Sequence, residues 1–274
     1  MKNDSKQDTE TVDLTEQILK KHQQLSRLHL LYLLLLLSLV VVCLWFTGFL
    51  DTARMSQGIP AIGVLISEMF PPDFSRWQSW LKPLLDTLAM SVAGTAFAVC
   101  LSLPIAFLAA RNTGHASVRW MARMILNVMR AIPELIMGIV FVAAVGFGML
   151  SGVLALGLHS VGMVGKFFAE SIEHAHPAPI EAVEATGASS LQTISHGVLP
   201  QVLPQFVDVT MYRWEYNFRA STVMGMVGAG GIGTDLIGSL RLLDYAQVGA
   251  LLIIILIAVT LVDGLSFLLR RRLT

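Results

Sequence analysis

The chain has 274 residues, of which 54% are hydrophobic and 14% charged, and its formal net charge is zero. Soluble domains carry about 25% charged residues, so this composition argues against a soluble protein and indicates a membrane protein. The neutral balance offers no basic surface to nucleic acid. The two cysteines, Cys43 and Cys100, lie in apolar runs without the spacing of a metal site or a disulfide.

The N-terminal part divides into a polar and an apolar stretch. Residues 1–27 are polar, and we expect a cytoplasmic segment there. Residues 28–50 are apolar and exceed the roughly 20 residues that cross a bilayer as a helix. They start too far from Met1, and end on side chains too large, for a cleavable signal peptide. The sequence therefore predicts an uncleaved first transmembrane helix.

A mixed segment, residues 51–82, follows this first span. It contains PPDFSRWQSW with Trp77 and Trp80, and tryptophan is enriched where membrane meets water. We expect a periplasmic connection that lies partly along the membrane surface.

Five more apolar stretches predict spans, which are about 84–110, 120–148, 152–169, 203–227 and 246–268. Lysine and arginine gather in the loops on the side of the N-terminus and in the basic tail 269–274, so both termini are expected in the cytoplasm. The expected fold is an all-α integral membrane protein with about six transmembrane helices.

One polar stretch, EAVEATGASSLQTISHGVLP at 181–200, interrupts the apolar spans on the cytoplasmic side. Ile180 and Val183 can line one side of a short helix, Gly187 interrupts it, and a second helix can follow. Pro200 suits the first turn of the next membrane helix, where a missing N–H costs nothing. The sequence predicts a helix–turn–helix elbow that is tied at both ends to membrane helices and can transmit a push.

This stretch resembles the EAA loop of bacterial ABC-importer permeases. The resemblance rests on residues at the family's spacing, which are Glu181, Ala182, Gly187, Leu199 and Pro200. Two positions depart from the pattern, since Val183 replaces a usual alanine and Gly197 a usual aliphatic residue. We include Glu184, the second carboxylate of the stretch, in the same expected coupling surface.

The resemblance covers about 83–268 and implies the type I ABC-importer permease fold there. It also implies a multi-pass protein of the bacterial inner membrane that works as a homodimer. Its partners would be two cytoplasmic ATPase subunits, on which the elbow docks, and an extracytoplasmic substrate-binding protein. ATP and Mg would bind to the ATPase subunit. This chain itself would bind no cofactor and no metal. In keeping with a transport subunit rather than an enzyme, the sequence lacks G-x-x-x-x-G-K-[ST].

A glycine run, GMVGAGGIG at 225–233, follows the fifth predicted span. It matches the G-x-G-x-x-G pattern of dinucleotide sites, but a membrane helix precedes it where that site needs a strand. Two interpretations stay open: close helix packing or a gate turn, and irregular backbone that contacts substrate. The candidate residues are Gly228, Gly230, Gly231 and Gly233.

Within the fifth span, the stretch MYRWEYNFRAST at 211–222 contains three charged residues, Arg213, Glu215 and Arg219. Arg213 is expected about 20 Å beyond Pro200 at 1.5 Å per residue, and each intramembrane ion costs about 2.5–3.5 kcal/mol. Glu215 and Arg219 are spaced to form a structural pair. Alternatively, the three charges line a substrate pathway, where their net charge of +1 suits an anion.

The run RWEYNFRASTVMGMVGAGGIG resembles the signature of phosphonate-importer permeases, some of which accept phosphite. GAGGIG is shared with methionine- and betaine-type permeases, whereas the more specific residues are Glu215, Asn217, Arg219 and Ser221. FPPDFSRWQ at 70–78 also resembles these permeases. The resemblance implies import of phosphonate or phosphite by alternating access. The nearest alternative is a methionine- or betaine-type ABC permease. A secondary transporter or a membrane hydrolase has less support, because neither an inverted repeat nor a catalytic constellation is found.

The third predicted span contains RAIPE at 130–134. Pro133 is expected to kink the helix. Arg130 and Glu134 are spaced to pair, and a gate role for Arg130 and Pro133 is an open alternative. In the fourth span, His159 is interpreted as a packed polar residue rather than a proton relay.

Overall fold

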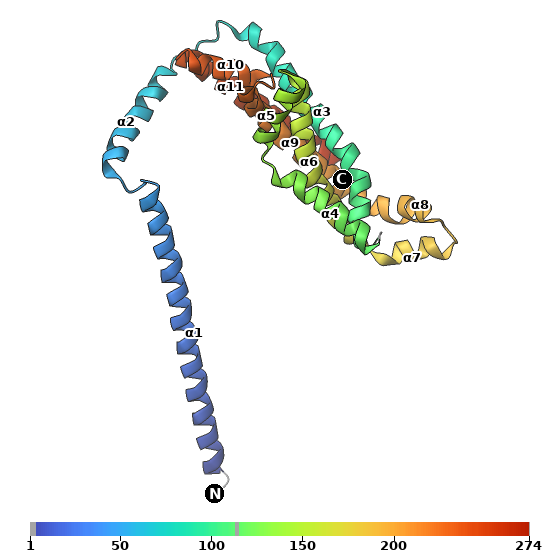
Figure 1. Ribbon diagram of the computed structural model, residues 1–274. Coiled ribbons are helices and arrows are strands. Elements are labelled where there is room, and N and C mark those ends of the chain that lie inside the picture. Colours follow the sequence, from blue (N-terminus) through green and yellow to red (C-terminus); the bar gives the residue numbers. More distant parts are fainter. Residues whose placement is uncertain (1–3, 113–114, 274) are drawn as a thin grey trace. The chain divides into compact units, whose positions relative to one another are not determined.

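The computed structural model describes residues 4–112 and 115–273 (Figure 1). Residues 1–3 of the predicted N-terminal segment and Thr274 of the predicted tail lie outside the described residues. Within the described part the chain is helical and forms no strand. It divides into two units, Met1–Ser67 and Glu68–Thr274, which are taken separately below.

The first unit contains α1 (Asp4–Phe46) and all of α2 (Thr52–Glu68) except its last residue. The apolar part of α1 is Leu25–Phe46, 22 residues long, so it begins near the predicted start and ends before the predicted Leu50. The helix itself begins at Asp4, so the polar stretch before the span is helical as well.

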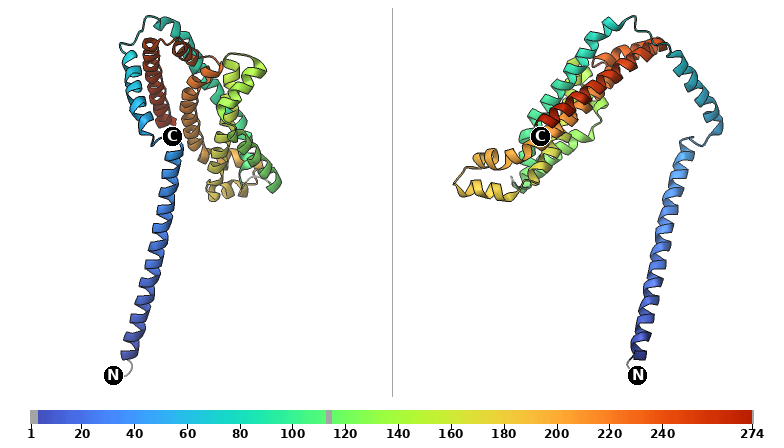
Figure 2. Two further views of the ribbon diagram at one scale, coloured as in Figure 1. Left: turned by 60° about the vertical axis from the view of Figure 1, so that its left-hand side comes forward. Right: turned by 180° about the vertical axis from the view of Figure 1, so that it is seen from behind.

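The second unit is a helical bundle (Figures 1 and 2). Its elements are α3 (Trp77–Ala109), α4 (Ala116–Ala131), α5 (Glu134–Val145), α6 (Met149–Glu173), α7 (Pro177–Ala185), α8 (Ser190–Thr193), the π-helical turn η1 (Ile194–Val198), α9 (Leu199–Met224), the 3₁₀ turn η2 (Gly225–Val227), α10 (Ile232–Arg241) and α11 (Tyr245–Leu273). In Figures 1 and 2, α7 and α8 project from one end of the bundle, opposite the end where α5 and α10 lie.

The six predicted spans correspond to four single helices and two bent pairs of helices. Of the described helices, the apolar part of α1, α3, α6 and α11 are long and apolar enough to cross a membrane, and counting each bent pair as one span gives six. The sequence predicted one kinked helix over 120–148. The bend is much sharper than a kink, because α4 and α5 are separate helices that meet at 87°. The second pair, α9 with η2 and α10, is bent by 46° at the glycine run.

Helix α6 forms the centre of the bundle and packs against α3, α4, α5 and α9. Glycines make these contacts possible. A Cβ on Gly152 would overlap Met90 of α3, and a Cβ on Gly162 would lie 2.6 Å from the Leu126 carbonyl oxygen of α4. Small residues at such interfaces let helix backbones approach closely, which is how membrane helices gain packing energy. The α3–α6 pair is therefore a tight scaffold for the elements that carry the candidate sites.

Candidate functional site

Residues 177–198 form the elbow between α6 and α9 (Figure 1). Helix α7 ends at Ala185, the chain turns at Gly187, and α8 with η1 leads into α9. The turn requires glycine, because its φ of +80° is left-handed, a conformation that costs other residues about 1–2 kcal/mol. Pro200 lies in the first turn of α9. The predicted helix–turn–helix geometry is confirmed.

The elbow surface carries the residues that the sequence assigned to coupling. Four are exposed: Glu181, Ala182, Glu184 and Gly187. Leu199 is half-buried and begins α9 together with Pro200. The sequence interpretation missed Leu191, whose 77% exposure makes it an unpacked apolar side chain on this surface. No sequence pattern marks a single leucine as exposed, so only the structure identifies it.

The departure at Gly197 has a structural reason. A Cβ on Gly197 would lie 3.2 Å from Cα of Ile180 on α7. A larger side chain, such as the aliphatic residue usual at this position, would push α7 away from η1. Gly197 thus lets the two arms of the elbow pack directly against each other, and it is buried in that contact.

Helix α9 buries a polar cluster against α3 and α6. Asn217 has no exposed surface; its Nδ2 donates to Thr95 Oγ1 at 2.9 Å, and its Oδ1 accepts from Ser160 Oγ at 3.0 Å. Arg213 Nε donates to the same Ser160 Oγ at 2.8 Å. On the neighbouring face, Trp214 Nε1 donates to Ser91 Oγ at 3.2 Å. These bonds satisfy polar groups that would otherwise cost energy inside a bundle.

Arg213 also connects this cluster to α5. Its guanidinium lies 4.2 Å from the ring centroid of Tyr216, whose hydroxyl donates to Glu134 Oε1 at 3.1 Å. Arg213 Nη2 and Glu134 Oε2 are buried without a hydrogen-bond partner. Since Arg213 is only 3% exposed, it lies in the packed interior of the bundle.

A second group of charges joins α9 to α11. Arg219 lies 2.9 Å from Asp263 and 3.9 Å from Glu215. Glu215 also pairs with Arg270, which lies 3.5 Å from Asp208. The expected ion pair between Glu215 and Arg219 is present, but its distance is longer than that of the ion pair between Arg219 and Asp263. Asp263 was missed, although a lone carboxylate in the predicted span 246–268 is a signal that the sequence offers.

The additional carboxylates change the charge balance that the sequence suggested. The group between α9 and α11 holds two arginines and three carboxylates, which are Arg219, Arg270, Asp208, Glu215 and Asp263. Their formal charges sum to −1, so the net charge of +1 no longer favours an anion. The remaining feature that favours an anion is Nη2 of Arg213, which is buried without a hydrogen-bond partner.

The glycine run forms a left-handed turn between η2 and α10. Gly228, Gly230 and Gly231 have φ values of +91°, +85° and +78°, which glycine adopts without steric cost. A Cβ on Gly233 would overlap the carbonyl oxygen of Thr222. Hydrogen bonds anchor the turn to α3 and to the start of α6, from Ile232 N to Thr87 Oγ1 at 2.8 Å and from Gly148 N to Gly228 O at 3.1 Å. Backbone shape and packing thus account for these glycines, and Ser221 is buried beside them with its hydroxyl donating to Asn217 O at 2.6 Å.

The pairing predicted for Arg130 and Glu134 is wrong. Pro133 stands at the break between α4 and α5, so the two residues no longer share a helix face. Arg130 is exposed, and Glu134 instead accepts from Tyr216 across the bundle. At the same break His159 Nδ1 lies 3.1 Å from Ile132 O, which is the contact of a packed polar residue.

A family model matches most of this bundle. It is described as a binding-protein-dependent transport system inner membrane component, and it matches residues 102–274. The phosphite transport system permease protein PtxC of Stutzerimonas stutzeri is 62% identical over 235 residues, covering 85% of this chain and 86% of that protein. The phosphate-import permease protein PhnE of Mycolicibacterium smegmatis is 40% identical over 84% of this chain and 43% of its own length.

Solved structures of ABC transporters share the fold. An inward-facing MetNI methionine ABC transporter aligns with a TM-score of 0.65 at 24% identity, covering 74% of this chain and 99% of that chain. An amino acid ABC transporter solved with histidines gives a TM-score of 0.60 at 18% identity, covering 73% and 99%. The bundle thus has the fold of ABC-importer permeases. The chain belongs to the family of binding-protein-dependent transport system inner membrane components, and it is a multi-pass protein of the inner membrane.

Proposed function

We propose that this chain is the membrane subunit of an ATP-driven importer that carries phosphite, or a related phosphorus oxyanion such as a phosphonate, by alternating access. The observation that carries the proposal is the 62% identity to a phosphite transport permease over 85% of the chain. The alternative of a methionine-type importer has weaker support. A probable D-methionine permease of Pasteurella multocida is 25% identical over 66% of the chain, and the MetNI likeness concerns the fold alone.

The exposed stripe of α9 supports a water-filled pathway. Along one face of this helix and into η2 the exposed residues are Asp208, Tyr212, Tyr216, Arg219, Val223 and Met226. Side-chain exposure is 51% for Arg219 and 42% for its partner Asp263. Charges facing hydrocarbon are costly, and Asp263 lies seven residues before Arg270, about 10 Å further into the span at 1.5 Å per residue. This stripe therefore suits water or another protein surface better than lipid.

The exposed stripe of α11 has the opposite character. It consists largely of aliphatic residues, which include Leu252, Leu256, Ile257, Leu261, Leu265 and Leu268. Such a face suits acyl chains. We infer that the α9 stripe faces a second copy of the chain across the pathway, so that a homodimer encloses the route of the substrate. The lysine and arginine distribution supports a cytoplasmic location for both termini.

We assign the elbow to the coupling contact with a separate ATPase subunit. In support, helices α7 and α8 project from the end of the bundle (Figure 1), and Leu191 offers an exposed apolar side chain for a groove. ATP and Mg are then bound by the ATPase, two copies of which serve the homodimer. An extracytoplasmic binding protein delivers the oxyanion to the opposite side of the membrane.

Uptake of labelled phosphite tests this function. We would measure it in cells that lack the chain, with and without the gene restored, and add phosphonate, phosphate, methionine or betaine as competitors. The proposal predicts restored uptake that phosphorus oxyanions alone inhibit. Restored methionine or betaine transport without phosphite uptake would instead keep the ABC permease and overturn the substrate assignment.

A further inference from the structure

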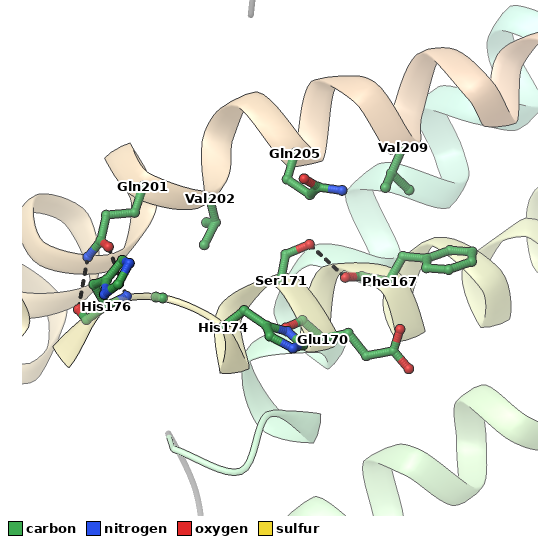
Figure 3. Close-up of a pocket in the computed structure, with 10 residues that line it drawn as sticks. Phe167, Glu170, Ser171, His174, His176, Gln201, Val202, Gln205 and Val209 are labelled. Atoms are coloured by element: carbon green, nitrogen blue, oxygen red, sulfur yellow. Dashed lines mark hydrogen bonds between the residues drawn. The ribbon is translucent and has the colours of Figure 1, made fainter.

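The side chain of Gln201 bonds both ends of the elbow. Its Oε1 accepts from the backbone N–H of His176 at 3.0 Å, where the chain leaves α6 and α7 begins. Its Nε2 donates to the carbonyl oxygens of His176 at 3.3 Å and of Gly197 at 2.6 Å. Figure 3 shows the bonds between Gln201 and His176. One amide from the first turns of α9 thus holds the start of α7 and the end of η1.

The amide of Gln201 bonds the backbone at two points where it departs from a regular α-helix. His176 is the N-cap residue of α7 and its own side chain makes no capping bond, so the amide of Gln201 receives an N–H that the helix leaves free. Gly197 belongs to the π-helical turn η1, whose wider hydrogen-bond ladder departs from the α-helix that follows. Gln201 therefore adds hydrogen bonds at two irregular points of the elbow, the start of α7 and the π-helical turn η1.

Gln201 lies at the base of the elbow, where the elbow joins the membrane helices α6 and α9. Beyond it the arms of the elbow touch where Gly197 approaches Ile180. Between α6 and α9 lies a pocket of about 460 Å³, lined by His174, His176, Gln201 and Gln205 among others. The two membrane helices also pack directly, since Val202 and Phe206 of α9 lie in one buried cluster with Phe168 and Ile172 of α6. The Gln201 amide adds a polar connection beside this packing, at the base of the elbow (Figure 3).

We propose that Gln201 is a positioning residue that makes the elbow one rigid lever. With the amide bonds in place, a displacement of the Gly187 turn moves α6 and α9 together. Without them, the elbow bends at its base, and ATPase closure is no longer fully transmitted to the membrane helices. This inference rests on the proposed function, in which the elbow receives that force.

The test compares phosphite accumulated with ATP hydrolysed. Proteoliposomes would contain the assembled transporter with its ATPase and binding protein. Gln201→Met keeps the side-chain length and removes the hydrogen bonds, and we expect the phosphite-to-ATP ratio to fall on the order of tenfold, as the loss of one or two net hydrogen bonds implies. Gln201→Glu keeps the acceptor but loses both donors, so its ratio should fall as well.

The matched control is Gln205→Met. Gln205 lies one turn along α9, lines the same pocket, is exposed and makes no side-chain hydrogen bond in the described structure. Its ratio should equal that of the wild type. Should Gln201→Met fail to assemble, Gln201→Glu supplies the decisive ratio.

The outcomes separate the two proposals. Wild-type proteoliposomes without ATP-dependent phosphite uptake would overturn the proposed function. Wild-type uptake together with Gln201 variants that lose transport and ATPase activity in equal proportion, or lose neither, would overturn the lever alone. A fall in the ratio with ATP hydrolysis largely retained supports it, since a purely structural defect lowers both activities together.

Discussion

Helices α6 and α9 are neighbours in one bundle but meet their surroundings in different ways. Helix α6 is packed on several sides, and 61% of the residues in its most apolar stretch are buried. At its glycines the neighbouring helices come so close that even a Cβ atom would overlap them. Helix α9 buries polar groups on one face and exposes tyrosines and charges on the other. The comparison shows how such a protein combines a fixed scaffold with a working surface. The following substitutions begin in the scaffold around α6 and end on the exposed surface of α9, in order of decreasing expected loss of stability.

Gly162→Ala should cause the largest loss. The new Cβ would lie 2.6 Å from the Leu126 carbonyl oxygen and 2.8 Å from the Arg130 backbone nitrogen. These are backbone atoms of α4 that cannot rotate away, so we expect a cost near the upper end of about 1–3 kcal/mol. Thermal unfolding of the purified transporter in detergent measures it. Gly264→Ala is the control, because no atom lies within 4 Å of its new Cβ, and an equal loss in both variants would contradict the scaffold.

Asn217→Ala should have an intermediate effect. It removes both the donor to Thr95 and the acceptor of Ser160. Their hydroxyls keep other partners, since Thr95 Oγ1 also donates to Ser91 O at 2.7 Å and Ser160 Oγ also accepts from Arg213. We therefore expect a cost of about 1–2 kcal/mol, read from the same unfolding curves. A variant as stable as the wild type would show that the buried cluster does not hold α9 to the scaffold.

Arg219→Ala should change stability least. Its side chain is half exposed, and such ion pairs contribute within about 1 kcal/mol. Because the residue lies on the proposed pathway, phosphite uptake should nevertheless fall at least tenfold. Asp263→Asn breaks the same ion pair and serves as the control, with a smaller effect on uptake. Normal folding with normal uptake in Arg219→Ala would leave this arginine a structural role only.

The sequence predicted the scaffold better than the working surface. Long apolar runs reveal spans directly, and fixed turn residues such as Gly187 and Pro200 revealed the elbow. Hydropathy does not report local backbone direction, so the 87° break at Pro133 was expected only as a kink. The pairing of Asn217 with Thr95 joins separate helices through short polar side chains that show no sequence periodicity. Asp263, by contrast, was visible as the lone carboxylate of its span.

The most direct test of the account is the water accessibility of the α9 stripe. Tyr212→Cys on α9 and Leu261→Cys on α11 would be made after replacing Cys43 and Cys100 by serine, since both are exposed. The two positions have similar exposure, 55% and 68%. The account predicts that a membrane-impermeant thiol reagent labels position 212 in the assembled transporter, that phosphite turnover changes the labelling rate, and that position 261 stays unlabelled in lipid. Equal labelling at the two positions, or labelling at 261 alone, would contradict the assignment of α9 to the pathway.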